Sequence, residues 1–426
     1  MERKKTRKTA RLCAVLLCAS LLLSACGSAP VVEVLRPEPL PAAAGLRIAV
    51  ASDLHLNPDN THKSAESGAD AYNLELVDAL LWDAKEQGAE ILLLTGDLVN
   101  GGKPHRHEAL AEKLRQTERT GLEIYVLPGN HDLAPIGQRE FAELYADFGY
   151  QEAFSRDEAS LSYCVKRGGL MILMMDTAGY PGDAIDLPGA RKRADSEAFL
   201  SEKTLLWAEE MLSLAREEGL KVLCAGHYNL LSPESRQEGR SGHYVENGAR
   251  FAALLQDYAV PLYCSGHTHI RAVWQEKGLT EQVTEYLLAY PTGYSVLDVS
   301  GDALTLTPRR VDVDAWAKAT GLTDPVLLDF ARWQQERLRA YADENVAYMA
   351  ARNPISRREK RQAAEFFYAV MDAYWQGTLH ERRAELEAMP GCEPFFHCAA
   401  GYAYEWWLKD LMENAGPMLA GFTLPI

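Results

Sequence analysis

The chain has 426 residues, of which 47% are apolar and 24% are charged, a balance typical of a globular protein with room for two or three domains. The formal net charge of -16 argues against a nucleic-acid-binding surface, because such a surface needs a basic patch. A phosphorylated substrate stays compatible with this charge, since bound divalent cations dominate the local field of a metal site.

The first 25 residues have the layout of a secretory signal. A basic run is followed by an apolar stretch over 12–23, which is short for a membrane span, and then by Leu-Ser-Ala-Cys ending at Cys26. This ending resembles a bacterial lipobox, which implies removal of residues 1–25 and lipidation of Cys26. We therefore predict an extracytoplasmic protein anchored to the bacterial cell membrane, with an uncleaved signal anchor as the alternative. Residues 26–45, rich in Pro and Ala, predict a flexible tether.

From residue 46 onward, short apolar runs alternate with longer amphipathic stretches. The short runs predict buried strands at 46–51, 91–95, 124–127, 170–175, 222–225 and 262–265. The amphipathic stretches predict helices at 74–87, 107–120, 202–218 and 247–258. Strands and helices in alternation predict an α/β fold whose sheet is packed on both faces.

After residue 265 the pattern changes. Four short runs predict antiparallel strands at 272–275, 284–288, 295–299 and 303–307. Beyond them the pattern predicts helices at 325–342, 357–375, 379–388 and 399–413. We therefore divide the chain into an α/β domain over 46–310 and a helical C-terminal domain over 311–426. Cys392 and Cys398 lie close together in a loop-like segment of the latter, and a disulfide between them is left open.

Five of the predicted strands end in residues that can bind metal ions. These residues are Asp53, His55, Asp97, Asn130, His227, His267 and His269. In an α/β sheet the ligand crevice lies beyond the carboxyl ends of the strands, so residues far apart in the sequence can converge there. Carboxylate, imidazole and amide oxygen suit hard to borderline divalent metals. The pattern therefore predicts a metal site.

The order of these residues resembles the signature of the calcineurin-like metallophosphoesterase superfamily: Asp-x-His, Gly-Asp, Gly-Asn-His-Asp, His and Gly-His-x-His. Every block occurs here in that order, over roughly residues 46–300. The resemblance implies a four-layer α-β-β-α sandwich and two divalent metal ions. One ion would be bound by Asp53, His55, Asp97 and His269. The other would be bound by Asp97, Asn130, His227 and His267, so that Asp97 bridges the two.

Such a centre predicts hydrolysis of phosphate esters by a metal-activated hydroxide. His131, next to a predicted ligand, is placed to bind phosphate or to protonate the leaving group. Asp132 is predicted to orient His131, as carboxylates orient imidazoles. Purple acid phosphatases of this superfamily carry a tyrosine three residues after the bridging aspartate, where this chain has Asn100. Mn, Zn or Fe(II) is therefore expected instead of a ferric site.

The lipobox, the phosphoesterase domain and the helical C-terminal domain together resemble bacterial lipoproteins of the class III cyclic-nucleotide phosphodiesterase type. The resemblance implies a phosphodiesterase whose substrate is a phosphorylated small molecule, namely a 3′,5′-cyclic nucleotide. A nucleotidase or general phosphomonoesterase would use the same metals. A metal-containing surface binding protein with little turnover is an alternative of another class. The complete ligand set together with His131 favours an enzyme.

Overall fold

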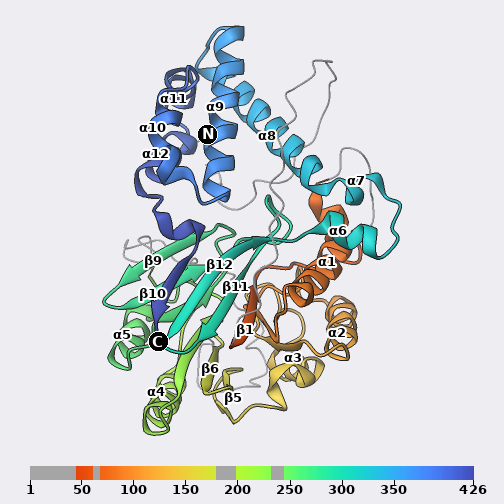
Figure 1. Ribbon diagram of the computed structural model, residues 1–426, viewed down its shortest axis with the longest axis vertical. Helices are drawn as coiled ribbons and strands as arrows, with labels where there is room; N and C mark the ends of the chain where they lie inside the picture. Colours follow the sequence, from red (N-terminus) through yellow and green to blue (C-terminus); the bar gives the residue numbers. More distant parts are fainter. Residues whose placement is uncertain (1–44, 61–67, 179–197, 232–243) are drawn as a thin grey trace, which may run out of the picture.

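The computed structural model describes residues 45–60, 68–178, 198–231 and 244–426, which form an α/β body and a helical region beside it (Figure 1). The predicted signal peptide, its Cys26 and the tether up to residue 44 lie outside the described residues. Among the described residues, no helix combines the length and apolar character needed to cross a membrane.

The described strands of the α/β body form two mixed sheets. The first has the order β13-β12-β11-β1-β2-β3. Its strands are β1 (Leu46–Ala51), β2 (Ile91–Leu94), β3 (Glu123–Val126), β11 (Gly293–Ser300), β12 (Ala303–Arg310) and β13 (Phe422–Pro425). The strands β1, β2 and β3 are parallel, whereas β11, β12 and β13 pair antiparallel to their neighbours.

The second sheet has the order β4-β5-β6-β7-β8-β10-β9. Its strands are β4 (Ser155–Arg156), β5 (Tyr163–Arg167), β6 (Leu170–Met175), β7 (Lys221–Gly226), β8 (Leu262–Ser265), β9 (Ala272–Glu276) and β10 (Leu279–Val283). The neighbours from β6 to β10 run parallel to one another, which sends the carboxyl ends of β7 and β8 to one edge.

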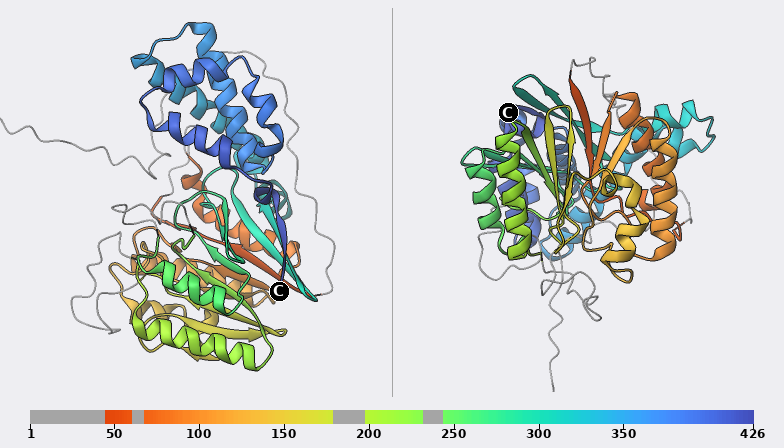
Figure 2. Two further views of the ribbon diagram at one scale, coloured as in Figure 1. Left: turned by 90° about the vertical axis from the view of Figure 1, so that its left-hand side faces the viewer. Right: turned by 90° about the horizontal axis from the view of Figure 1, so that it is seen from below.

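Helices cover the outer face of each sheet. The view from below shows α4 and α5 on one side, α1, α2 and α3 on the other, and the strands between them (Figure 2, right). These helices are α1 (Asn73–Glu86), α2 (Pro104–Glu118), α3 (Gln138–Leu144), α4 (Glu202–Glu217) and α5 (Gly248–Asp257). The predicted four-layer α-β-β-α sandwich is therefore confirmed.

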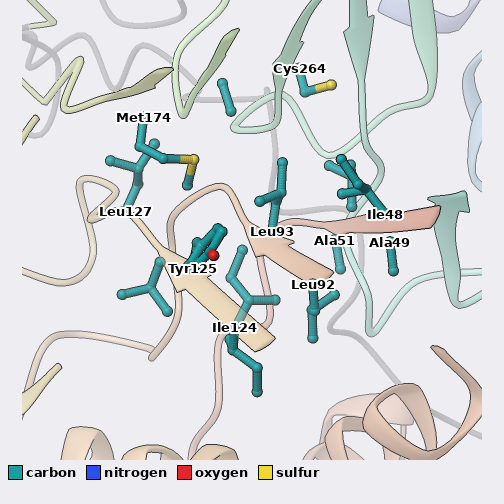
Figure 3. Close-up of a cluster of buried hydrophobic side chains, with 14 of the residues drawn as sticks. Ile48, Ala49, Ala51, Leu92, Leu93, Ile124, Tyr125, Leu127, Met174 and Cys264 are labelled. Atoms are coloured by element: carbon teal, nitrogen blue, oxygen red, sulfur yellow. The ribbon is translucent and has the colours of Figure 1, made fainter. Parts of the chain in front are cut away.

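The main core fills the space between the two sheets. Figure 3 shows side chains of β1, β2 and β3, among them Ile48 and Leu93, on the same side as Met174 of β6 and Cys264 of β8. All four side chains are completely buried. Because both faces of these strands are covered, the strands consist of continuous apolar runs without alternation, which is why the sequence pattern revealed them.

The strand predicted at 284–288 is wrong. The structure has β10 at Leu279–Val283, and residues 284–288 are mostly irregular chain on the way back to the first sheet. All five residues of β10 are buried, including Thr280, Glu281 and Gln282. Polar residues in a buried strand break the apolar run that would have indicated it.

The C-terminal region contains α6 (Val313–Ala319), α7 (Pro325–Leu328), α8 (Phe330–Arg352), α9 (Arg357–Trp375), α10 (Leu379–Glu387), α11 (Cys392–Ala399) and α12 (Ala403–Asn414). Most of α8 and the helices after it enclose a second hydrophobic core around Phe366 and Phe367 of α9. The helices α6 and α7 instead pack on the main core, through Trp316 and Leu327.

Two predictions about this region need correction. It is not wholly helical, because β13 leaves the helices and pairs with β12 at the edge of the first sheet. The segment holding Cys392 and Cys398 is not a loop but the helix α11, and both cysteines are free thiols. A hydrogen-bonded helical turn holds residues six apart on different faces, which explains why these two do not pair.

Candidate dinuclear metal centre

The seven predicted ligands lie on loops that follow β1, β2, β3, β7 and β8, and the structure brings them together. The loops of the two sheets touch directly. A Cβ atom on Gly96, in the loop after β2, would lie 2.6 Å from Nδ1 of His227, in the loop after β7. Only glycine fits there, which explains the Gly-Asp pair of the sequence motif.

The backbone at the ligands is strained. Asp53, His55, Asp97, His267 and His269 have φ angles of 53°, 42°, 50°, 68° and 62°. Among the described residues, they are five of the eight non-glycine residues in the left-handed region. Each such residue costs roughly 1–3 kcal/mol and persists only where the surroundings impose it, which is common at functional sites.

The first group of ligand atoms comes from Asp53, His55, Asp97 and His269. The two Nε2 atoms of His55 and His269 are 3.2 Å apart. Oδ1 of Asp53 lies 3.2 Å from Nε2 of His269, and Oδ2 of Asp97 lies 3.5 Å from Nε2 of His55. Ligands bound to one ion at about 2.1 Å in a tetrahedral arrangement stand roughly 3.4 Å from each other. The spacing therefore fits a shared metal ion.

The second group comes from Asp97, His227 and His267. Nε2 of His227 lies 3.4 Å from Oδ2 of Asp97 and 3.2 Å from Oδ1 of Asn130, which adds Asn130 to this group. The same oxygen, Oδ2 of Asp97, thus faces histidines of both groups. This is the arrangement expected of a carboxylate that bridges two ions.

The chemistry of the donors also fits cations. Oδ1 of Asp53 is buried and accepts no hydrogen bond from the described residues. Burial raises the pKa of the Asp53 carboxyl, but the nearby His269 and His55 outweigh burial and hold this pKa well below its usual value. Burial lowers the pKa of His227, yet the charge of Asp97 outweighs it and raises this pKa to about 9. The carboxylates of this pocket therefore favour positive charge beside them, as a cation site requires.

Neighbouring groups fix the orientation of the ligand rings. Nδ1 of His227 donates a hydrogen bond to the carbonyl oxygen of Thr95 at 2.9 Å, which leaves Nε2 free to bind metal. The ring of His269 stacks on Tyr286, with centroids 4.7 Å apart and an interplanar angle of 21°. The ring of His267 lies against Tyr228, with centroids 4.1 Å apart.

His131 lies beside the centre, as predicted. The residue is exposed to solvent, and the centroid of its ring is 4.8 Å from that of His55. Its backbone N–H donates to Oδ1 of Asp97 at 2.8 Å, which fixes the loop without using the imidazole. The ring makes no hydrogen bond to any residue that the structure describes, so it is available to a bound molecule.

Asp132 has a different role from the predicted one. Its carboxylate is completely buried and accepts hydrogen bonds from the backbone N–H groups of Leu98, Val99 and Gly129, at 3.1, 3.0 and 2.8 Å. Both oxygens are therefore used by the backbone, and neither orients the ring of His131 as predicted. We correct its assignment: Asp132 joins the loop that carries Asp97 to the loop that carries Asn130.

Glu281 joins two loops of the second sheet, as Asp132 joins two loops of the first sheet. The sequence did not predict this role. Its carboxylate accepts hydrogen bonds from the N–H groups of Leu230 and Leu231 and from the hydroxyl of Ser265. Burial raises the pKa of this carboxyl to about 7. Glu281 thus joins the loops that carry His227 and His267. A glutamate inside an expected strand would have indicated this role, but the sequence pattern predicted no strand at the position of β10.

Residues 46–271, more than half of the chain, match the calcineurin-like phosphoesterase family, so the protein belongs to that family. Its centre of Asp and His residues makes it a metallophosphoesterase. Residues 312–414 match a second family, described as the C-terminal domain of cyclic nucleotide phosphodiesterase.

Three individual proteins are similar to this chain at 25% sequence identity or less. The chain is 25% identical over 246 residues to a probable glycerophosphodiester phosphodiesterase GpdQ of Arcobacter nitrofigilis, a match that covers 55% of this chain and 76% of the relative. A dimetal phosphatase from Danio rerio matches with a TM-score of 0.46 and 11% identity, over 62% of this chain and 96% of that one. A putative 5′-nucleotidase from Staphylococcus aureus matches with a TM-score of 0.41 and 13% identity, over 63% and 54%.

We expect Asp97→Asn to lose both ions, because one carboxylate oxygen faces both groups of ligands. Removing a partner that only supports a ligand costs about 10- to 100-fold in metal affinity, so loss of the bridge should cost at least that. Metal content after dialysis, measured by mass spectrometry, checks this. Asp59→Asn is the control, because Asp59 is an exposed carboxylate bound to Arg106. Two ions and normal turnover in Asp97→Asn would show that Asp97 is not the bridge.

Proposed function

We propose that the protein is a phosphodiesterase that hydrolyses small phosphate diesters, with 3′,5′-cyclic nucleotides as its substrate class. The observation that carries this proposal is the pairing of a phosphoesterase domain with a helical region that matches the C-terminal domain of cyclic nucleotide phosphodiesterase. The name of the relative from Arcobacter nitrofigilis, a probable diester hydrolase, supports diesters in general. Mn, Zn and Fe(II) are the proposed metals.

The residues of the chain divide the chemical work. The two ions, when bound, supply Lewis acidity that neutralises the phosphate oxygens and lowers the pKa of a water. Asp132 and Glu281 hold the loops that carry the ligands in place. His131 is the exposed group beside the centre, and we propose that it donates a proton to the oxygen that leaves phosphorus.

A hydrolysis panel with the metal-loaded protein tests the substrate class. It compares bis-p-nitrophenyl phosphate, cyclic AMP and cyclic GMP with p-nitrophenyl phosphate and nucleoside monophosphates, each with Mn, Zn or Fe(II). We expect kcat/KM for the diesters to exceed that for the monoesters by at least about tenfold, a modest discrimination for a polar site. Preference for the monoesters would favour the nucleotidase or general phosphomonoesterase alternative. Negligible turnover of every compound would favour the surface binding protein.

The role of His131 predicts a dependence on the leaving group. We expect His131→Ala to retain both ions, because its imidazole is not among the ligand atoms, and to slow cyclic AMP hydrolysis by roughly two to four orders of magnitude. The loss should be smaller for bis-p-nitrophenyl phosphate, because p-nitrophenolate leaves without protonation whereas a ribose alkoxide leaves poorly.

Steady-state kinetics on both substrates and metal analysis of the variant check this prediction. His105→Ala is the matched control, because His105 is an exposed histidine bound to Asp59. An equal loss on both substrates would mean that His131 positions phosphate without donating a proton. Loss of an ion would make His131 a metal ligand.

We further propose that Cys26 carries a lipid that anchors the enzyme to the outer face of the bacterial cell membrane. The proposal is supported by the Leu-Ser-Ala-Cys sequence after an apolar stretch of signal length. Cys26→Ala should move the protein from the membrane fraction to the medium or leave its signal uncleaved, because the lipid supplies the hold on the membrane. A processed variant that still sediments with the membrane would contradict lipid anchoring at Cys26.

A further inference from the structure

A buried ion pair lies where the helical region meets the metal centre. The guanidinium of Arg271 donates two hydrogen bonds to the carboxylate of Glu285, one of them from Nε to Oε2 at 3.2 Å. Arg271 is 5% exposed and Glu285 is completely buried. Gly293 of β11 makes room for the pair, because a Cβ atom there would collide with Oε1 of Glu285 and press on Nη2 of Arg271.

Both partners are adjacent in sequence to parts of the metal centre. Arg271 follows the ligand His269 by two residues, and Glu285 directly precedes Tyr286. The ring of Tyr286 stacks on His269 at 4.7 Å and meets His55 edge-on at 5.2 Å. The ion pair therefore joins the segment that carries a metal ligand to the segment that carries the aromatic ring supporting two ligands.

The same arginine is held by the helical region. Its Nη1 donates to the carbonyl oxygen of Trp375 at 2.8 Å, and its own carbonyl oxygen accepts a hydrogen bond from the hydroxyl of Tyr374. Tyr374 and Trp375 are the last two residues of α9. The C-terminal end of one long helix is thus attached to the chain two residues beyond His269.

Stability alone is a weak explanation for this pair. Removing two charges from water is costly, and an apolar pair of the same volume often stabilises a fold equally well. What a buried bidentate pair provides is geometry, since the planar fork of arginine fixes both the distance and the direction of its partner. Here the elements whose positions it fixes are a metal-binding loop, the segment of Tyr286 and the end of α9.

We propose that Arg271 and Glu285 are positioning residues through which the helical region sets the metal affinity of the group formed by Asp53, His55, Asp97 and His269. The loops of the second group, which is completed by Asn130, His227 and His267, are also joined by Asp132 and Glu281, although His267 shares its loop with His269. The helical region is therefore expected to act more strongly on the ion of the first group, because Arg271 lies nearer to His269 than to His267 in the chain. This inference rests on the dinuclear centre described above.

Calorimetric titration of the metal-free protein with Mn²⁺ tests the proposal by giving a dissociation constant for each ion. The constant that His269→Ala abolishes belongs to the first group. Glu285→Gln keeps the shape of the side chain and removes its charge, and we expect it to raise that constant roughly 10- to 100-fold, the usual effect of losing a partner of a ligand. The other constant should change less, because Asp132 and Glu281 also hold the loops of the second group.

Tyr374→Phe tests the link to the helical region and leaves the ion pair intact. It removes one hydrogen bond between α9 and Arg271, so the same constant should rise roughly 2- to 10-fold. Tyr341→Phe is the matched control. It removes a hydrogen bond to Tyr404 inside the helical region that does not involve Arg271, and it should change neither constant.

The outcomes separate two kinds of failure. Wild-type affinity for both ions in Tyr374→Phe would overturn the inference, as would an equal weakening of both ions in Glu285→Gln. An effect of Tyr341→Phe as large as that of Tyr374→Phe would overturn it too, because it would reflect a general loss of stability. Binding of fewer than two Mn²⁺ ions by the wild-type protein would instead contradict the dinuclear centre itself.

Discussion

The carboxylate of Asp97 is the group at which the loops of the two sheets meet. Its Oδ1 accepts a hydrogen bond from the N–H of His131. Its Oδ2 faces His55 in the loop after β1 of the first sheet and His227 in the loop after β7 of the second sheet. This carboxylate can face both histidines only if the two sheets pack with the loops after β2 and β7 in contact. Gly96 in the loop after β2 and Gly129 in the loop after β3 leave room for His227, and the apolar core between the sheets holds them at this distance.

Holding so many polar groups in one buried place has a conformational cost, and the structure shows what offsets it. Five ligands adopt left-handed backbone angles that other parts of the fold must impose. Three buried carboxylates that do not face the ions contribute to this. Asp132, Glu281 and Glu285 each join two separate segments by hydrogen bonds to backbone groups or to a buried partner. The precision of the centre therefore comes from residues around the ligands as much as from the ligands themselves.

The sequence predicted the parts of the fold that local pattern encodes. The strands β1, β2 and β8 are largely apolar runs, and metal-binding residues follow their ends, so composition and position both indicated them. The strand β6 was indicated by its apolar run alone. The strand β10 was missed because Glu281 and its neighbours are polar, and their burial depends on partners in distant loops. The partners of Asp132 could not be predicted either, since they are backbone groups brought close only by the folded loops after β2 and β3. Sequence spacing suggested an adjacent histidine instead.

Because the chain returns to the first sheet in β13, the helical region lies between two strands of that sheet. Since β12 and β13 are neighbours in one sheet, the helices between them are an insertion into the phosphoesterase fold and not a tail attached to its end. Ending the chain after β12 would remove an edge strand as well as the helices. An insertion with both ends fixed in one sheet can be lengthened, shortened or exchanged during evolution while the host fold stays closed. This offers a route by which one metal centre could acquire different specificities.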